Sequence, residues 1–387
     1  MIQTASIKTL TCSLALLVWQ VISAQEHCVS GRYGHEAVFD SAQIVTYPNI
    51  IYATAPNILT NNPVDLAMDV WCADPAVDAI SERPVVLLIH GGGFATGNRA
   101  AMNYQCMEYA RRGYVAITMS YRLGWNCDPN SGLLLCALCG PQVGNFRKAA
   151  YAAVQDVRAA LRYIHAHASE WNGDAQHVFI AGESAGSIAA LQAVIWQDEE
   201  AAEFSLAAAN QLGGLDASGN VLTGYPVIRG IINNCGAVFQ TAHIDSEDYR
   251  PLLSFHDEGD CVVPYAGGQV LGCFGCTAFP WAQGSDALHN LWLQEEECTE
   301  LNTVPGSLNH CSYPALYVVR RASCFIKRTL CGVCVSLDNS NIYAYSPCQT
   351  LGQDPSNAAC PADLNHNGLV DVEDLMQFIQ LFGQPCE

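Results

Sequence analysis

One pentapeptide, Gly-Glu-Ser-Ala-Gly at residues 182–186, strongly constrains the fold because it joins two different periodicities. The apolar run before it, residues 177–181, is typical of a buried strand, and the residues after it follow a helical pattern. A chance glycine–serine turn is the alternative, but a strand-to-helix junction requires small residues here because the serine takes a strained backbone conformation. The motif therefore predicts a sharp turn that presents the Ser184 hydroxyl at the carboxyl end of a sheet.

Apolar runs alternate with helical segments along much of the chain. Continuous apolar runs, typical of strands buried on both faces, occur at residues 85–90, 114–120 and 177–181. Further strands are expected at residues 228–239, 252–256 and 298–303, and helices at residues 149–167, 285–297 and 313–330. This alternation predicts an α/β fold in which a parallel sheet is covered by helices on both faces.

A second motif, His90-Gly91-Gly92-Gly93-Phe94, follows the first buried strand. Three glycines let a backbone approach a substrate closely and turn its N–H groups toward a developing negative charge. The alternative is a flexible loop without a role. Its place directly after a buried strand, and before the serine turn, favours an oxyanion hole.

These motifs resemble landmarks of the α/β-hydrolases, specifically the carboxylesterase and hormone-sensitive-lipase-like branches. The similar segments are RPVVLLIHGGGFATG, MSYRLG, VQDVRAALRYI and AGESAGS, and the similarity spans about residues 39–330. The resemblance implies an eight-stranded, mostly parallel sheet and a Ser-His-acid triad with Ser184 as nucleophile. It also implies an oxyanion hole formed by the N–H groups of Gly92, Gly93 and Ala185.

The acid of such a triad follows the serine along the chain. The stretch HDEGDCVVPY offers Asp257 and Asp260. The resembling family carries its acid on the aspartate of a H-x-x-x-D-x-x-V-P loop, which corresponds to Asp260, with Asp257 as the alternative. Glu183, inside the pentapeptide, is expected to support the turn.

The histidine is expected beyond the acid, where His289 and His310 both occur. His289 lies within an amphipathic helical pattern, whereas His310 lies in the loop PGSLNHCSYP. A loop over the carboxyl edge of the sheet suits proton transfer, so His310 is the predicted base and His289 the alternative. Cys311 is a candidate for tethering this loop through a disulfide.

The first 24 residues have the layout of a secretory signal, with Lys8 before an apolar core at residues 14–21. Eighteen of the nineteen cysteines would remain in the mature chain, which predicts disulfides of undetermined connectivity; zinc is disfavoured because no histidine lies at zinc-finger spacing. An excess of 37 acidic over 17 basic residues disfavours nucleic acid and anionic membrane surfaces as partners. No other stretch is long and apolar enough to span a membrane.

The C-terminal region is predicted to form a separate unit. Residues 341–360 have the composition of a linker, and residues 361–387 resemble one dockerin repeat. The expected calcium ligands are Asp363, Asn365, Asn367, the Leu369 carbonyl, Asp371 and Asp374. A solvated acidic turn is the alternative. A dockerin has two such repeats and this chain has one, so a cohesin-type partner is disfavoured.

The sequence thus predicts a secreted serine esterase, extracellular, periplasmic or on the cell surface, with its catalytic domain at residues 25–340. Catalysis requires no cofactor, and Ca²⁺ has a structural role in the tail. The substrate is a small or polymer-linked ester, with acetyl and feruloyl esters of polysaccharide as candidates. The alternatives are an exopeptidase on the same fold and a non-catalytic esterase-like binding protein. Residues 124–146 form an insertion, either a lid or a packed loop.

Overall fold

The computed structural model describes residues 31–125, 142–274 and 278–340. The signal-like segment, most of the insertion, the linker and the calcium-loop residues lie outside the described residues. Among the helices that are described, none combines the length and apolar character needed to cross a bilayer.

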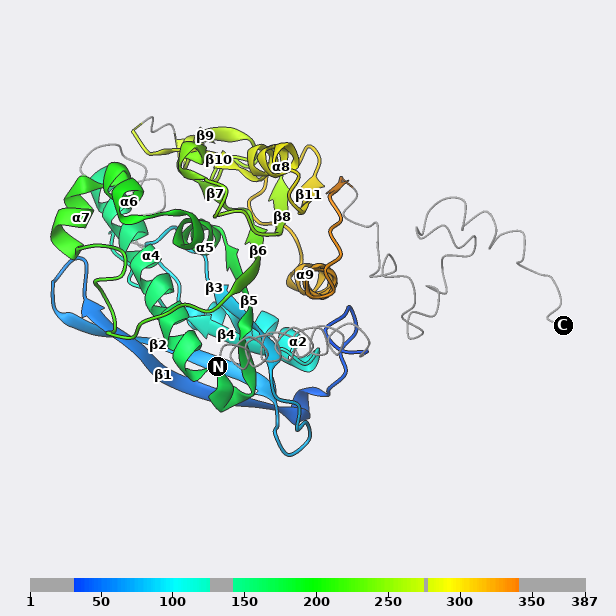
Figure 1. Cartoon of the computed structure of the whole chain (residues 1–387). Coiled ribbons are helices and arrows are strands. Elements are labelled where there is room, and N and C mark those ends of the chain that lie inside the picture. The colour runs from blue at the N-terminus through cyan, green and yellow to red at the C-terminus, as the bar shows by residue number, and fades with distance from the viewer. Residues whose placement is uncertain (1–30, 126–141, 275–277, 341–387) are drawn as a thin grey trace, which may run out of the picture.

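A twisted nine-stranded sheet forms the centre of the molecule (Figure 1). Its order is β1-β2-β4-β3-β5-β6-β8-β11-β12. β2 runs antiparallel to both of its neighbours, β1 and β4, and the strands from β4 to β12 run parallel to one another. The strands are β1 (Ile44–Pro56), β2 (Pro63–Ala73), β3 (Arg83–Ile89), β4 (Val115–Met119), β5 (Gly173–Glu183), β6 (Ile228–Asn234), β8 (Leu252–Asp257), β11 (Thr299–Val304) and β12 (Leu337–Asn339). The predicted α/β class and mostly parallel sheet are confirmed. The sheet has one strand more than the eight expected, and the three-residue β12 forms one of its edges.

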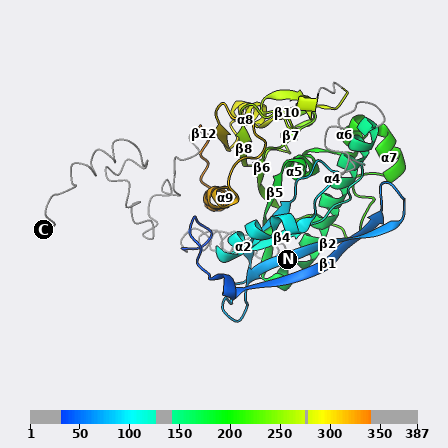
Figure 2. The ribbon, with the colours of Figure 1, turned by 180° about the vertical axis from the view of Figure 1, so that it is seen from behind.

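Helices cover both faces of the sheet (Figures 1 and 2). The helices are α2 (Asn103–Arg111), α4 (Gln142–His167), α5 (Ala185–Ile195), α6 (Asp198–Phe204), α7 (Leu206–Leu212), α8 (Ser285–Gln294) and α9 (Ala315–Leu330). Side chains of α2 and α9 belong to one buried apolar cluster, while those of α4, α5 and α8 belong to another. Two cores, one on each face, therefore hold the sheet in place.

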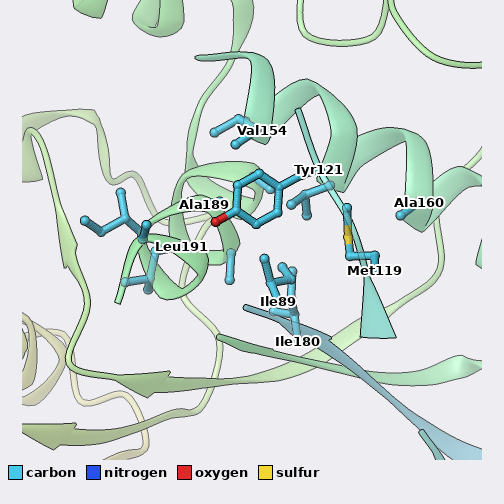
Figure 3. Close-up of a cluster of buried hydrophobic side chains, with 14 of the residues drawn as sticks. Ile89, Met119, Tyr121, Val154, Ala160, Ile180, Ala189 and Leu191 are labelled. Atoms are coloured by element: carbon cyan, nitrogen blue, oxygen red, sulfur yellow. The ribbon is translucent and has the colours of Figure 1, made fainter. Parts of the chain in front are cut away.

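Strand β3 is buried on both faces, which explains its continuous apolar sequence. Val85, Leu87 and Ile89 enter the core beneath α4 and α5, whereas Val86 and Leu88 enter the core beneath α2 and α9. Because successive side chains of a strand point to opposite faces, a strand buried on both faces has no position for a polar residue. Figure 3 shows the first core, where Ile89 and residues of β4 and β5 face residues of α4 and α5.

The strand expected at residues 228–239 is shorter than predicted. β6 ends at Asn234 because Cys235 takes a positive φ of 50°, which turns the chain out of the sheet. Residues Ala237–Val238 then form β7 of a second, three-stranded sheet with β10 (Trp281–Gly284) and β9 (Gly267–Gln269). The apolar residues after the turn therefore belong to a different sheet from those before it. This turn brings Cys235 to the edge of the sheet that carries the candidate site.

Candidate active site

The pentapeptide forms the predicted strand-to-helix turn. Ser184 lies between β5 and α5 with φ 54° and ψ −121°, a conformation that L-residues rarely adopt. A Cβ atom on Gly186 would lie 2.2 Å from the Ile89 carbonyl oxygen, and one on Gly182 would lie 2.4 Å from the Ser187 nitrogen. Both glycines are therefore required by close backbone approach, and together they hold the serine against the end of β3.

The structure brings Ser184, Asp260 and His310 together. His310 Nε2 lies 2.8 Å from Ser184 Oγ, and its Nδ1 lies 2.6 Å from Asp260 Oδ2. Ser184 and Asp260 are buried, whereas the His310 side chain is 24% exposed. An imidazole placed between a hydroxyl and a carboxylate in this way can take the hydroxyl proton while the carboxylate orients the ring.

The two alternative residues have other partners. Asp257 accepts hydrogen bonds from the backbone N–H and the hydroxyl of Ser312, at 2.9 and 2.5 Å. His289 lies on α8 and pairs its Nδ1 with Thr299 Oγ1 at 2.9 Å. Asp257 thus fixes the chain just beyond His310, and His289 belongs to the packing of α8 on β11.

Asp260 is held as a carboxylate. Its Oδ1 accepts the N–H groups of Val262 and Val263, at 2.8 and 3.2 Å. Burial raises the pKa of Asp260, but the hydrogen bonds that it accepts from His256 and His310 outweigh this effect and lower the pKa to about 2 from 3.8. The acid is therefore ionised at neutral pH and cannot rotate away from His310 without losing these bonds.

The triglycine loop passes directly beside the serine. A Cβ atom on Gly91 would lie 3.2 Å from Ser184 Cβ, and Gly92 and Gly93 have φ values of 113° and 62°. His90 Nδ1 contacts the Gly91 carbonyl at 2.7 Å, which fixes the first turn of the loop.

The backbone N–H groups near Ser184 are available to a ligand. Within the described part of the chain, neither Gly92 nor Gly93 donates its N–H to a protein group. Ala185 is the first residue of α5, so its N–H has no intrahelical acceptor. These groups, on the loop that passes Ser184 and at the start of α5, can bind an oxygen that gains negative charge.

Two disulfides lie directly beside the candidate residues. Cys311, next to His310, is bonded to Cys235 at the end of β6, and Cys261, next to Asp260, is bonded to Cys273. The predicted tether of the His310 loop by Cys311 is confirmed. Cys72 and Cys106, in contrast, are free and buried in the two cores.

Glu183 does more than fill the turn. This half-buried residue is one of those that line a small cavity between β5, β6, α2 and α9, together with Asn234 and Tyr313. Burial raises the pKa of Glu183, while the charge of nearby His310 lowers it. Burial is the larger effect, so the pKa of Glu183 is raised overall.

Sequence reasoning missed a polar group behind the acid. His256 lies at the start of the H-x-x-x-D motif, and its Nε2 lies 3.3 Å from Asp260 Oδ2. Asp260 and Val263 contact His256 from the same loop, whereas Ser285, on the other side of the ring, lies 29 residues away along the chain. The motif spacing was the one signal that could have pointed to His256.

Comparison with known proteins finds similarity in one part of the chain. Residues 65–205 match the model of the carboxylesterase family. The neuroligin-like protein glit-1 of Caenorhabditis elegans is 29% identical over 122 residues, 32% of this chain and 15% of that protein. The fumonisin B1 esterase of Sphingopyxis macrogoltabida is 31% identical over 124 residues, 32% of this chain and 22% of that protein.

The likeness to whole proteins is limited. The chain spans no more than about a quarter of the length of the first curated relatives it matches, from 15% to 25%. Among solved structures, esterase 2 of Thermogutta terrifontis phosphorylated by paraoxon is similar with a TM-score of 0.43 and 16% identity, covering 71% of this chain and 86% of that one. The matched region of the carboxylesterase family contains the triglycine loop and the serine turn, whereas Asp260 and His310 lie beyond it.

Proposed function

We propose that this protein hydrolyses carboxylic esters through Ser184, His310 and Asp260. The observation that carries the proposal is the contact of one imidazole with both partners, 2.8 Å to the serine oxygen and 2.6 Å to the carboxylate. The match of residues 65–205 to the carboxylesterase family supports the same chemistry. This support is independent of the contacts of His310, because His310 and Asp260 lie outside the matched residues.

The proposed cycle follows from the hydrogen-bond pattern. His310 Nε2 takes the proton of Ser184 as the hydroxyl oxygen bonds to the acyl carbon, and Asp260 stabilises the imidazolium. The N–H groups of Gly92, Gly93 and Ala185 bind the resulting oxyanion, at about 3 kcal/mol for each donor. The imidazolium then protonates the departing alcohol. Water, deprotonated by the same imidazole, attacks the acyl group and releases the carboxylic acid and Ser184.

Substrate class is the finer part of the proposal. Residues 204–230 hold the end of α6, the short helix α7 and a loop, so this stretch adds no large helical cap to the site. A site without such a cap suits small esters and esters linked to a polymer, and acetyl and feruloyl groups on polysaccharide are the candidates. Three disulfides among the described residues support secretion, since disulfides persist in oxidising compartments.

The test is a substrate screen with matched variants. Purified protein should hydrolyse nitrophenyl acetate or methyl ferulate, and Ser184→Ala and His310→Ala should each lower kcat by at least about 1,000-fold. Release of amino acids from peptides without ester turnover would favour the exopeptidase. Absence of turnover on all acetyl, feruloyl, longer acyl and peptide substrates, in a folded protein, would favour the binding protein.

A further inference from the structure

A buried chain of hydrogen bonds leads from the helix after Ser184 to the far side of Asp260. Its members are Ser187, Asn233, Ser285 and His256, all fully buried, on α5, β6, α8 and β8. These elements adjoin one another in the sheet and the layer above it (Figure 1). Polar groups in such a place are costly unless each one is paired, so the direction of every bond in the chain matters.

The direction of the hydrogen bonds at Asn233 is set by a backbone N–H group, which can only donate. Asn233 Oδ1 lies 2.9 Å from the nitrogen of Gly236, so it accepts that bond, and it also accepts the hydroxyl of Ser187 at 2.5 Å. The Asn233 amide nitrogen must then face the opposite way. There it lies 3.0 Å from Ser285 Oγ and donates to it.

The direction of the hydrogen bond between Ser285 and His256 follows from that at Asn233. Ser285 Oγ accepts from Asn233, and its one other partner among the described residues is His256 Nδ1, 2.7 Å away, so the hydroxyl proton is satisfied only when it is donated to that nitrogen. A neutral imidazole whose Nδ1 accepts carries its proton on Nε2. His256 Nε2 lies 3.0 Å from the Val263 carbonyl and 3.3 Å from Asp260 Oδ2, and both of these oxygens accept only. Every bond in the chain is therefore satisfied when His256 is neutral and protonated on Nε2.

Asp260 Oδ2 consequently lies between two imidazoles, of which only one can exchange its proton with a substrate. His310 is partly exposed and contacts Ser184, so it can exchange its proton with the substrate. His256 is fully buried, and its other nitrogen is occupied by Ser285. His256 thus presents a fixed N–H dipole to the carboxylate and also holds the turn that contains Asp260, through the Val263 carbonyl.

We propose that His256 is a positioning residue: the Asn233–Ser285 chain locks its tautomer, and the locked N–H fixes Asp260 in the orientation that His310 requires. This inference rests on the proposed function, since it assigns His256 a role in the same reaction. It adds a second histidine that acts through the acid and never touches substrate.

The kinetic test compares substitutions that keep or remove the N–H. His256→Phe retains an aromatic ring without a donor and should lower kcat about tenfold with KM changed less than about twofold. His256→Gln keeps an amide N–H near the Nε2 position and should restore kcat to within about threefold of the wild type. Ser285→Ala unlocks the tautomer and should give an intermediate loss. Rates are divided by the concentration of reactive Ser184, measured by active-site titration. Unfolded molecules in the sample therefore do not affect the comparison.

The matched control is His289→Phe, the same substitution at another buried histidine. His289 bonds to Thr299 on β11 and makes no contact with Asp260, so kcat per titrated serine should stay within about twofold. A spectroscopic readout accompanies the kinetics. In protein labelled with ¹⁵N-histidine, the His256 signals, assigned by their loss in His256→Gln, should show a bare Nδ1 and a protonated Nε2.

The inference would be overturned by a kcat of His256→Phe like that of the control, or by a protonated Nδ1 on His256. Equal losses in His256→Phe and His256→Gln would also overturn it, because a purely structural role does not depend on the N–H. A folded wild-type protein that neither hydrolyses esters nor reacts at Ser184 would instead refute the proposed function. The nitrogen spectra would still decide the tautomer in that case.

Discussion

Removal of the Cys235–Cys311 disulfide should damage catalysis more than it damages folding. The bond joins the end of β6, next to the serine turn, to the residue after His310. Both cysteines have positive φ values, 50° and 53°, so the loop is held in a conformation that it would leave if released. The perturbation is the double variant Cys235→Ala/Cys311→Ala, which leaves no new free thiol.

The expected loss of stability follows from the sequence separation of 76 residues. Closing a loop of that length removes unfolded-state entropy equivalent to about 4.5 kcal/mol at 25 °C. The Cys298–Cys334 bond, with a separation of 36 residues, gives about 4 kcal/mol by the same relation. It joins the amino end of β11 to the segment after α9, away from the carboxyl edge that carries the site. The pair Cys298→Ala/Cys334→Ala is therefore a control of nearly equal cost.

The two double variants should differ in activity. A misplacement of about 1 Å at the reacting groups costs up to about 100-fold, so Cys235→Ala/Cys311→Ala should lower kcat per titrated serine by about 10- to 100-fold. Cys298→Ala/Cys334→Ala should keep kcat within about twofold. Urea unfolding gives the stabilities, and nitrophenyl acetate hydrolysis at 25 °C gives the rates. Equal kcat values in the two variants would refute the reasoning that the Cys235–Cys311 bond positions His310.

Further predictions concern the turn, the acid, the core and the tail. Gly186→Ala should abolish soluble folded protein or activity, because its Cβ would lie 2.2 Å from a carbonyl oxygen of β3; expression and circular dichroism test this. The pKa of Asp260 is about 2, below its ordinary 3.8, so its ionisation stabilises the fold above about pH 4 and this contribution is lost as pH falls toward 2. Wild type should lose about 1 kcal/mol more than Asp260→Asn between pH 5 and pH 3 in urea titrations. Asp156→Asn, which leaves the buried Arg122 guanidinium without its carboxylate at 2.8 Å, should cost about 3–5 kcal/mol by the same method. Calcium binding by residues 363–374 stays a prediction from sequence; calorimetry with Ca²⁺ should show one site that Asp363→Ala removes.

Local backbone rules made the serine turn and the triglycine loop predictable. Glycines at residues 182 and 186 are needed whatever else the fold contains, because they lie against backbone atoms of β3 and α5. Apolar runs likewise predicted β3, β4 and β5, since strands buried on both faces leave a continuous signal. The choice of Asp260 and His310 over their alternatives depended on a resemblance, because a loop carboxylate or imidazole carries no periodic pattern.

Pairings across distant elements could not be predicted. Cys273 and Cys334 each lie in a C-x-x-C pair, yet they bond to Cys261 and Cys298 because tertiary geometry, not spacing, brings the sulfur atoms together. The chain of hydrogen bonds behind Asp260 likewise depends on the order of strands in the sheet and on how α8 packs against β8. Such contacts become visible once the strand order is known.

The most direct measurement is the site and extent of covalent modification by a fluorophosphonate. An alcohol that is activated by an imidazole and faces an oxyanion hole should react once per molecule, and peptide mass spectrometry should locate the adduct on Ser184. Ester hydrolysis should fall in proportion to the adduct, and His310→Ala should react at least about 100-fold more slowly. An adduct on another residue, or full hydrolytic activity in protein completely modified at Ser184, would contradict the account.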